Sequence, residues 1–146
     1  MQIDKTVQSP ASPAETFAFL ADFTTTEQWD PGTERTERVS GDGGVGTVYR
    51  NTSRFLGRST ELSYVVREYQ PDTRVVLRGE NKSVIAHDTM TVTPAAGGGA
   101  TVRYQARFDL KGLARLAAPL FVPAFARLGN AGADQLQRTL NRLGSR

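Results

Sequence analysis

The order of hydrophobic patterns along the chain is the feature that most constrains its fold. One alternating segment comes first, then a short helical stretch, a run of further alternating segments, and a long helical segment from about Leu113 to Leu143. Alternation with a period of two predicts strands, whereas apolar residues three and four apart predict a helix. This order predicts an α+β fold in which a curved antiparallel sheet grips a C-terminal helix, a shape that usually encloses a cavity.

Seven strands are expected, separated by glycine, proline and polar turn residues. They span about 2–8, 33–40, 47–55, 59–69, 74–81, 84–93 and 101–110. A first short helix should begin with Ser12 as its N-cap and Pro13 at its first position. A second brief helical turn should reach Trp29. In the C-terminal segment, Pro119 and Pro123 predict a short helix and a kink before the main helix.

The last two strands have the most informative faces. In the last strand, apolar residues alternate with polar ones: Val102, Tyr104, Ala106, Phe108 and Leu110. One face of this strand should therefore be buried and the other exposed to solvent. If the preceding strand pairs with this one across the Gly97–Gly99 loop, its residues 86, 88, 90 and 92 share the buried face. Asp88 is then expected to point inward and His87 outward.

Composition excludes several kinds of site. The 146 residues suit a single domain, 1–146, with a core of its own. With no cysteine and one histidine, the chain offers no thiol chemistry and a poor ligand set for zinc, so no metal and no cofactor are expected. Its 18 lysines and arginines give a net charge of only +3 and are scattered, so no nucleic-acid partner is expected.

The N-terminus and the apolar segments favour a cytoplasmic location. Residues 1–5 lack the basic leader and apolar run of a secretory signal. The weakly charged stretch Leu116–Phe125 holds two prolines and is too short to span a bilayer, so integral membrane association is not expected. The sequence leaves the oligomeric state open, a homodimer included.

Two motif-like patterns are better explained without chemistry. Gly41–Gly46 matches the dinucleotide-binding fingerprint, but a strand follows it where the phosphate site needs a helix N-terminus. It is read as a turn. Ser83, His87 and Asp88 contain the residue types of a triad, yet residues of one strand cannot converge as nucleophile, base and orienting group.

Asp88 and His87 are the weak candidates for catalysis, and no catalytic residue is assigned. A carboxylate on a buried face must be hydrogen-bonded, paired or protonated, and a paired or solvated structural role for Asp88 is the favoured interpretation. A role for His87 as a pocket acid or base competes with that of an ordinary surface histidine.

Aromatic residues interleaved with polar ones on inward faces suggest a ligand pocket. The competing interpretation is that the rings only fill the core. The candidate ligand-binding residues are Trp29, Tyr49, Asn51, Tyr64, Asp88, Met90, Tyr104, Phe108, Phe121 and Phe125.

Four segments carry a resemblance to a known family: Phe23–Gly32, Gly44–Tyr49, Tyr64–Pro71 and Leu110–Gly112. With them, nearly the whole chain resembles the polyketide cyclase/dehydrase-like (SRPBCC) branch of the START and birch-pollen-allergen superfamily. The resemblance implies a helix-grip fold with a cavity between the concave sheet and the C-terminal helix. It also implies a hydrophobic small-molecule ligand, but it transfers no complete set of functional residues.

Three functions follow from these observations. The leading one is binding of a lipid, polyketide or aromatic metabolite in the cavity. The alternative is a cyclase or dehydratase in which Asp88 or His87 moves protons while Tyr64 or Tyr104 polarises a carbonyl. The third is an interaction protein that uses Leu116–Phe125 as an apolar patch toward a protein or a membrane surface.

Overall fold

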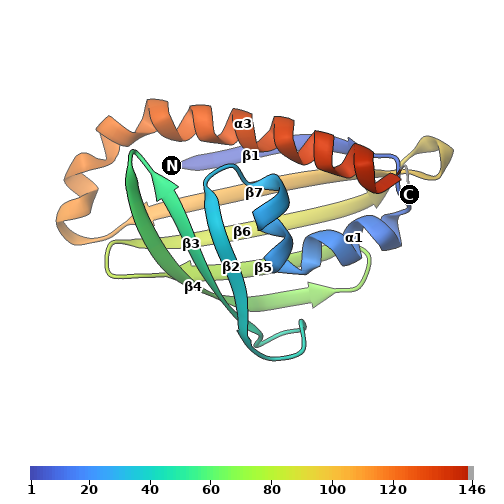
Figure 1. Ribbon diagram of the computed structural model, residues 1–146, viewed down its shortest axis with the longest axis horizontal. Helices are drawn as coiled ribbons and strands as arrows, with labels where there is room; N and C mark the ends of the chain where they lie inside the picture. Colours follow the sequence, from blue (N-terminus) through green and yellow to red (C-terminus); the bar gives the residue numbers. More distant parts are fainter. Residues whose placement is uncertain (145–146) are drawn as a thin grey trace.

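Seven antiparallel strands form one strongly curved sheet in the order β1-β7-β6-β5-β4-β3-β2 (Figure 1). The structure is a computed structural model that describes residues 1–144. The strands are β1 (Gln2–Ser9), β2 (Thr33–Ser40), β3 (Val48–Phe55), β4 (Arg58–Gln70), β5 (Arg74–Glu80), β6 (Val84–Pro94) and β7 (Ala100–Leu110). The seven predicted strands are confirmed, each boundary to within about one residue.

The helices join the sheet edges and cover the sheet. They are α1 (Pro13–Ala21), η1 (Phe23–Thr25), α2 (Thr26–Trp29), η2 (Ala96–Gly98), η3 (Gly112–Ala117) and α3 (Ala118–Gly144). Ser12 caps α1 as predicted, because its Oγ accepts from the backbone N–H of Glu15 at 3.1 Å. Since β1 and β2 lie at opposite edges of the sheet, the α1–α2 segment crosses from one edge to the other.

The register of β6 and β7 confirms the predicted faces. Met90 lies opposite Tyr104 and Asp88 opposite Ala106. Asp88 is buried together with its same-face neighbours on β6. The side chain of His87 is 34 % exposed on the other face, with its Nε2 4.0 Å from a carboxylate oxygen of Asp109. Period-two alternation therefore determines which of these two titratable groups faces the interior.

The C-terminal helix packs closely on the first strand. Gly129 of α3 faces Ile3 of β1, and a Cβ added to this glycine would lie 2.9 Å from Ile3 Cγ1. A side chain at this position would force either Ile3 or the helix to shift. Leu136 and Leu140, further along α3, belong to the main hydrophobic core together with Trp29 and Phe17. The second half of α3 is thus anchored to both the sheet and the N-terminal helices.

Leucines at helical spacing form a stripe along the C-terminal segment, and the structure divides this leucine stripe. Leu136 and Leu140 are buried, but Leu113, Leu116 and Leu120 are 86 %, 79 % and 78 % exposed. The reason is geometric, because η3 and the first turns of α3 extend beyond the start of β1 (Figure 1). The short helix predicted before the main one is present as η3. Within residues 1–144, no helix combines the length and hydropathy that crossing a membrane requires.

Candidate ligand-binding site

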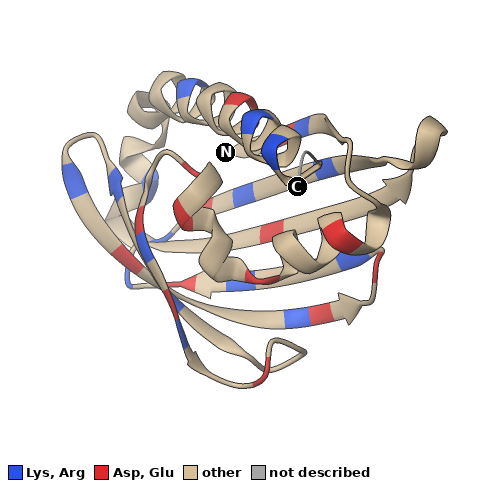
Figure 2. Cartoon of the chain, turned by 45° about the vertical axis from the view of Figure 1, so that its right-hand side comes forward, with Lys and Arg blue, Asp and Glu red and all other residues tan. Residues whose placement is uncertain are grey.

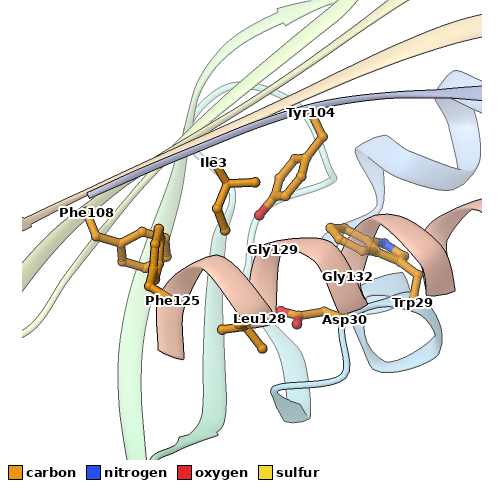
Figure 3. A pocket seen from close by; sticks show the side chains of 9 residues that line it. All are labelled: Ile3, Trp29, Asp30, Tyr104, Phe108, Phe125, Leu128, Gly129 and Gly132. Carbon is orange, nitrogen blue, oxygen red and sulfur yellow. The ribbon is translucent and has the colours of Figure 1, made fainter. Parts of the chain in front are cut away.

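A small cavity lies between α3 and the strands β1 and β7, next to the end of α2 (Figure 3). Its volume is about 40 Å³. It is lined by Ile3, Trp29, Asp30, Tyr104, Phe108, Phe125, Leu128, Gly129 and Gly132. This volume holds a few water molecules at most, whereas pockets for drug-sized ligands measure roughly 300–1,000 Å³. The cavity in this structure is therefore too small to hold a drug-sized ligand.

Aromatic rings line the cavity along its length, from Phe125 to Trp29. Tyr104 and Phe108 lie four residues apart on β7 and so project from the same face. The Phe108 ring packs edge-on against Phe125 of α3, with 4.9 Å between ring centroids. At the other end, Tyr104 packs edge-on against Trp29, with 5.3 Å between centroids. Strand β7 and the helices α2 and α3 thus each supply part of the cavity wall.

The polar end of the cavity is made by Tyr104 and Asp30. Figure 3 shows the Tyr104 hydroxyl and the Asp30 carboxylate directed toward the same space beside Gly129. The two carboxylate oxygens of Asp30 accept from the backbone N–H of Gly32 at 3.0 Å and the hydroxyl of Thr33 at 2.9 Å. Burial raises the pKa of Asp30, and these two hydrogen bonds oppose that shift without cancelling it.

Asp88 lies behind Tyr104 and completes a buried acidic cluster. Burial raises the pKa of Asp88 to about 7, the negative charge of Asp30 adds to the shift, and a hydrogen bond with Tyr104 opposes it. Within residues 1–144, Asp88 Oδ1 has no hydrogen-bond partner. Burial and both carboxylates also hold the pKa values of Tyr64 and Tyr104 well above the ordinary range, so both phenols stay protonated. We call Asp30, Asp88, Tyr64 and Tyr104 the acidic cluster.

Four of the ten predicted ligand-binding residues line the cavity: Trp29, Tyr104, Phe108 and Phe125. Tyr49 and Tyr64 instead pack around Phe23, with ring centroids 5.8 Å and 4.7 Å away. Asn51 donates to the hydroxyls of Thr33 and Thr36. Tyr49 and Tyr64 are thus part of the main hydrophobic core, and all three residues lie away from the cavity wall.

The remaining predicted residues also lie away from the cavity wall. Met90 is fully buried in the core, and Asp88 reaches the cavity only through its contact with Tyr104. Phe121 packs against Phe55, with 5.9 Å between ring centroids. His87 lies on the outer face of the sheet, so the structure does not bring it to the site.

Sequence reasoning missed five lining residues: Ile3, Asp30, Leu128, Gly129 and Gly132. Asp30 stood in a turn signature and carried no periodicity that would orient it. Gly129 and Gly132 have no side chain, and their role depends on where α3 crosses β1. Ile3 had a usable signal, because alternation in the first strand placed it on an apolar face.

A wider groove meets the cavity at Phe108. It has a volume of about 440 Å³ and is lined by Met1, Phe108, Asp109, Leu110, Arg115 and Ala118. Asp109 and Arg115 are exposed, so the groove faces solvent beneath η3. Because Phe108 lines both spaces, movement of this ring and of its partner Phe125 would connect them.

Comparisons with known proteins agree with this architecture. The family model described as polyketide cyclase/dehydrase and lipid transport matches residues 1–141. A Streptomyces aromatase/cyclase superposes with a TM-score of 0.80 at 14 % identity, covering 96 % of this chain and 93 % of its own. A conserved Geobacillus kaustophilus protein gives 0.71 at 13 % identity, covering 96 % and 95 %. A START superfamily protein of Mycobacterium smegmatis gives 0.65 at 14 %, covering 92 % and 98 %. No curated protein matches the sequence significantly.

Proposed function

The chain belongs to the polyketide cyclase/dehydrase and lipid transport family, and we propose that it binds a hydrophobic small molecule between the sheet and α3. The observation that carries the proposal is the cavity, which has an aliphatic and aromatic wall and one polar end. That combination is typical of ligand sites, in which apolar area supplies affinity and a few polar groups fix orientation. The family membership predicted from the sequence is confirmed, while the ligand is our inference.

Binding requires the first half of α3 to move away from the sheet. Between residues 118 and 128, Phe125 is the only buried side chain. Pro123 lies inside the helix and has no N–H to donate to the carbonyl of Pro119, so this half lacks one helical hydrogen bond. Gly129 and Gly132 follow, at the point where the anchored half begins. The arrangement supports a helix that hinges near these glycines and lifts Phe125 and Leu128 from the cavity.

The acidic cluster selects the chemical class of the ligand. A ligand carboxylate at the polar end would face Asp30 directly and Asp88 behind Tyr104, and like charges in a buried site repel strongly. A neutral hydroxyl or carbonyl group instead finds the Tyr104 hydroxyl, which can donate or accept. We therefore expect a neutral hydrophobic ligand with a hydroxyl or carbonyl, such as a polyketide, an aromatic metabolite or a neutral lipid.

The test uses the single tryptophan of the chain, because Trp29 lines the cavity. Decanol and decanoate have the same chain length and differ in the charge of the head group. Titration with decanol near pH 7.5 should change the fluorescence of Trp29 until the change saturates. Decanoate should bind at least about tenfold more weakly. The proposal fails if neither compound gives a saturable change, and the inferred class is wrong if decanoate binds as well as decanol.

A second candidate, proton transfer to or from the ligand, is favoured by the contact between Asp88 and Tyr104. A ligand carbonyl beside the Tyr104 hydroxyl would be polarised by that donor, while the carboxyl behind it titrates near neutral pH. This arrangement suits cyclase or dehydratase chemistry. His87 has no part in it, since it lies on the outer face.

A further inference from the structure

An exposed apolar surface covers one end of the molecule. Leu113, Leu116, Leu120 and Val122 project from η3 and the start of α3, and all are more than half exposed. Leu56, at the turn between β3 and β4, is 58 % exposed. The edge-on contact between Phe55 and Phe121 joins the two segments, so the surface is continuous. We call Leu56, Leu113, Leu116, Leu120 and Val122 the apolar end.

The charged residues on the helical part of this end are all basic. No acidic residue occurs from Leu110 to Ala133, whereas Lys111, Arg115 and Arg127 lie within that stretch. In Figure 2 the first turns of α3 carry no acidic residue. Basic residues lie near the β3–β4 turn. Three acids lie beside this end, and each is paired with a cation. Glu80 accepts from Lys111 at 2.8 Å, Asp109 lies 3.3 Å from Arg107, and Glu34 lies 3.7 Å from Arg54 near the β3–β4 turn.

From these two observations we propose that the apolar end docks on a bilayer surface that contains anionic lipids. Exposed leucines flanked by basic residues insert into the boundary between head groups and acyl chains, while the cations contact lipid phosphates. The stretch is short and holds Pro119 and Pro123, so it can lie in the interface but cannot cross the bilayer.

A second copy of the chain fits this surface less well. In a symmetric dimer the same patch meets itself, which would bring Arg115 and Lys111 of one copy toward those of the other. The apolar side chains also project outward, whereas a partner helix would need a groove to receive it. A flat anionic surface satisfies both the projection and the charge.

Docking would place the apolar end around the opening of the site. The groove that meets the cavity at Phe108 is also lined by Arg115 and Ala118, which belong to η3 and α3. A hydrophobic ligand could then pass between bilayer and cavity with little exposure to water. The docking proposal does not depend on such transfer, because it rests on the surface alone.

The experiment is co-sedimentation of the protein with vesicles. Vesicles of phosphatidylcholine alone are compared with vesicles that contain about 30 % phosphatidylglycerol. The intact protein should pellet with the anionic vesicles, more weakly with the neutral ones, and less at high salt. The double variant Leu116→Ser/Leu120→Ser should lose at least about tenfold in vesicle affinity, and Arg115→Glu should lose binding to the anionic vesicles selectively.

The control variant Val39→Ser/Val45→Ser removes two exposed valines of β2 and the β2–β3 loop. It should pellet as the unmodified protein does. The proposal is overturned if the protein pellets with neither vesicle, or if the leucine variant binds as tightly as the control. A dimer interface at the leucines would also overturn it. In that case the unmodified protein is a dimer without lipid, and the leucine variant is a monomer that binds vesicles as tightly as the unmodified protein does. Decanol binding should persist in the leucine variant, so docking and ligand binding can fail separately.

Discussion

Asp88 is the residue whose chemistry is most altered by its position in the fold. An aspartate whose pKa rises from 3.8 to about 7 on folding binds its proton more readily in the native state than in the unfolded chain. The contribution of this group to stability is therefore most favourable below about pH 4 and is lost as the pH rises toward 7. The pKa of Asp30 is also raised by burial, so both carboxyls make the protein less stable as the pH rises.

Replacing Asp88 with asparagine should remove the loss of stability that ionisation of Asp88 causes at high pH, because an amide does not ionise. We expect Asp88→Asn to be more stable than the unmodified protein by about 2–4 kcal/mol at pH 8, with a much smaller difference at pH 4.5. Urea unfolding at the two pH values measures both differences. A variant that is less stable at pH 8 would show that the carboxylate is well paired. The same variant lacks the titratable group that proton transfer would need.

Gly132 offers a way to fill the cavity without disturbing the core. A Cβ at this position would meet only the Pro31 Cδ, at 3.9 Å. Gly132→Ala should therefore stabilise the helix by about 0.5–1 kcal/mol and keep decanol binding. The larger side chain of Gly132→Leu occupies the cavity and should reduce decanol affinity at least about tenfold. Fluorescence titration and thermal unfolding of both variants separate occlusion from loss of structure, and unchanged binding by Gly132→Leu would place the ligand elsewhere.

At the scale of single residues, the sequence could orient strand residues but not loop or helix ones. Alternation placed Asp88 inward and His87 outward, because a strand has a fixed period. Asp30 lies in a turn, where no period applies, so its place at the polar end of the cavity was not predicted. The sequence also could not distinguish Tyr104, which lines the cavity, from Tyr49, which packs on Phe23, since both alternate inward.

At the scale of elements, α3 is one helix with two differently held halves. The half from Ala118 to Leu128 buries one side chain and contains Pro123, whereas the half after Gly132 buries Leu136, Thr139 and Leu140. Amides of the first half should exchange with solvent at least about 100-fold faster than those of residues 136–143, because local opening costs less where little is buried. Hydrogen exchange resolved by NMR measures this ratio.

The matched variant for this prediction is Pro123→Ala, which restores the missing N–H. It should slow exchange in the first half of α3 and leave the second half unchanged. Equal protection of both halves in the unmodified protein would argue against a hinge near Gly129 and Gly132.

Strand and helix boundaries were predictable because they follow local patterns. The division of the leucine stripe was not, since it depends on where the sheet ends beneath the helix.

At the scale of the whole molecule, the cavity and the apolar end use different parts of the same C-terminal segment. Phe125 and Leu128 of the first half of α3, with the two glycines that follow, cover the cavity. The exposed leucines lie on η3 and the start of α3, and Arg115 and Ala118 of the same two elements line the neighbouring groove. The sequence predicted the shape because consecutive strands from β2 to β7 are neighbours and the last helix had to cover the remaining apolar face. It could not predict the cavity volume, which depends on how far side chains from β1, α2, β7, α3 and the turn after α2 fill the space between sheet and helix.

The pairing of β1 with β7 has a consequence for how the protein is made. Gln2 lies opposite Arg107, and Ile3 opposite Ala106 and against Gly129 of α3. β1 therefore leaves the ribosome well before its partners β7 and α3 and must wait for them, and contacts so distant in sequence make folding slow. Until then β1 offers an unpaired edge and an uncovered apolar face, which is the state that chaperones bind and that aggregates. Folding of the sheet should thus be completed only after β7 and α3 have been synthesised.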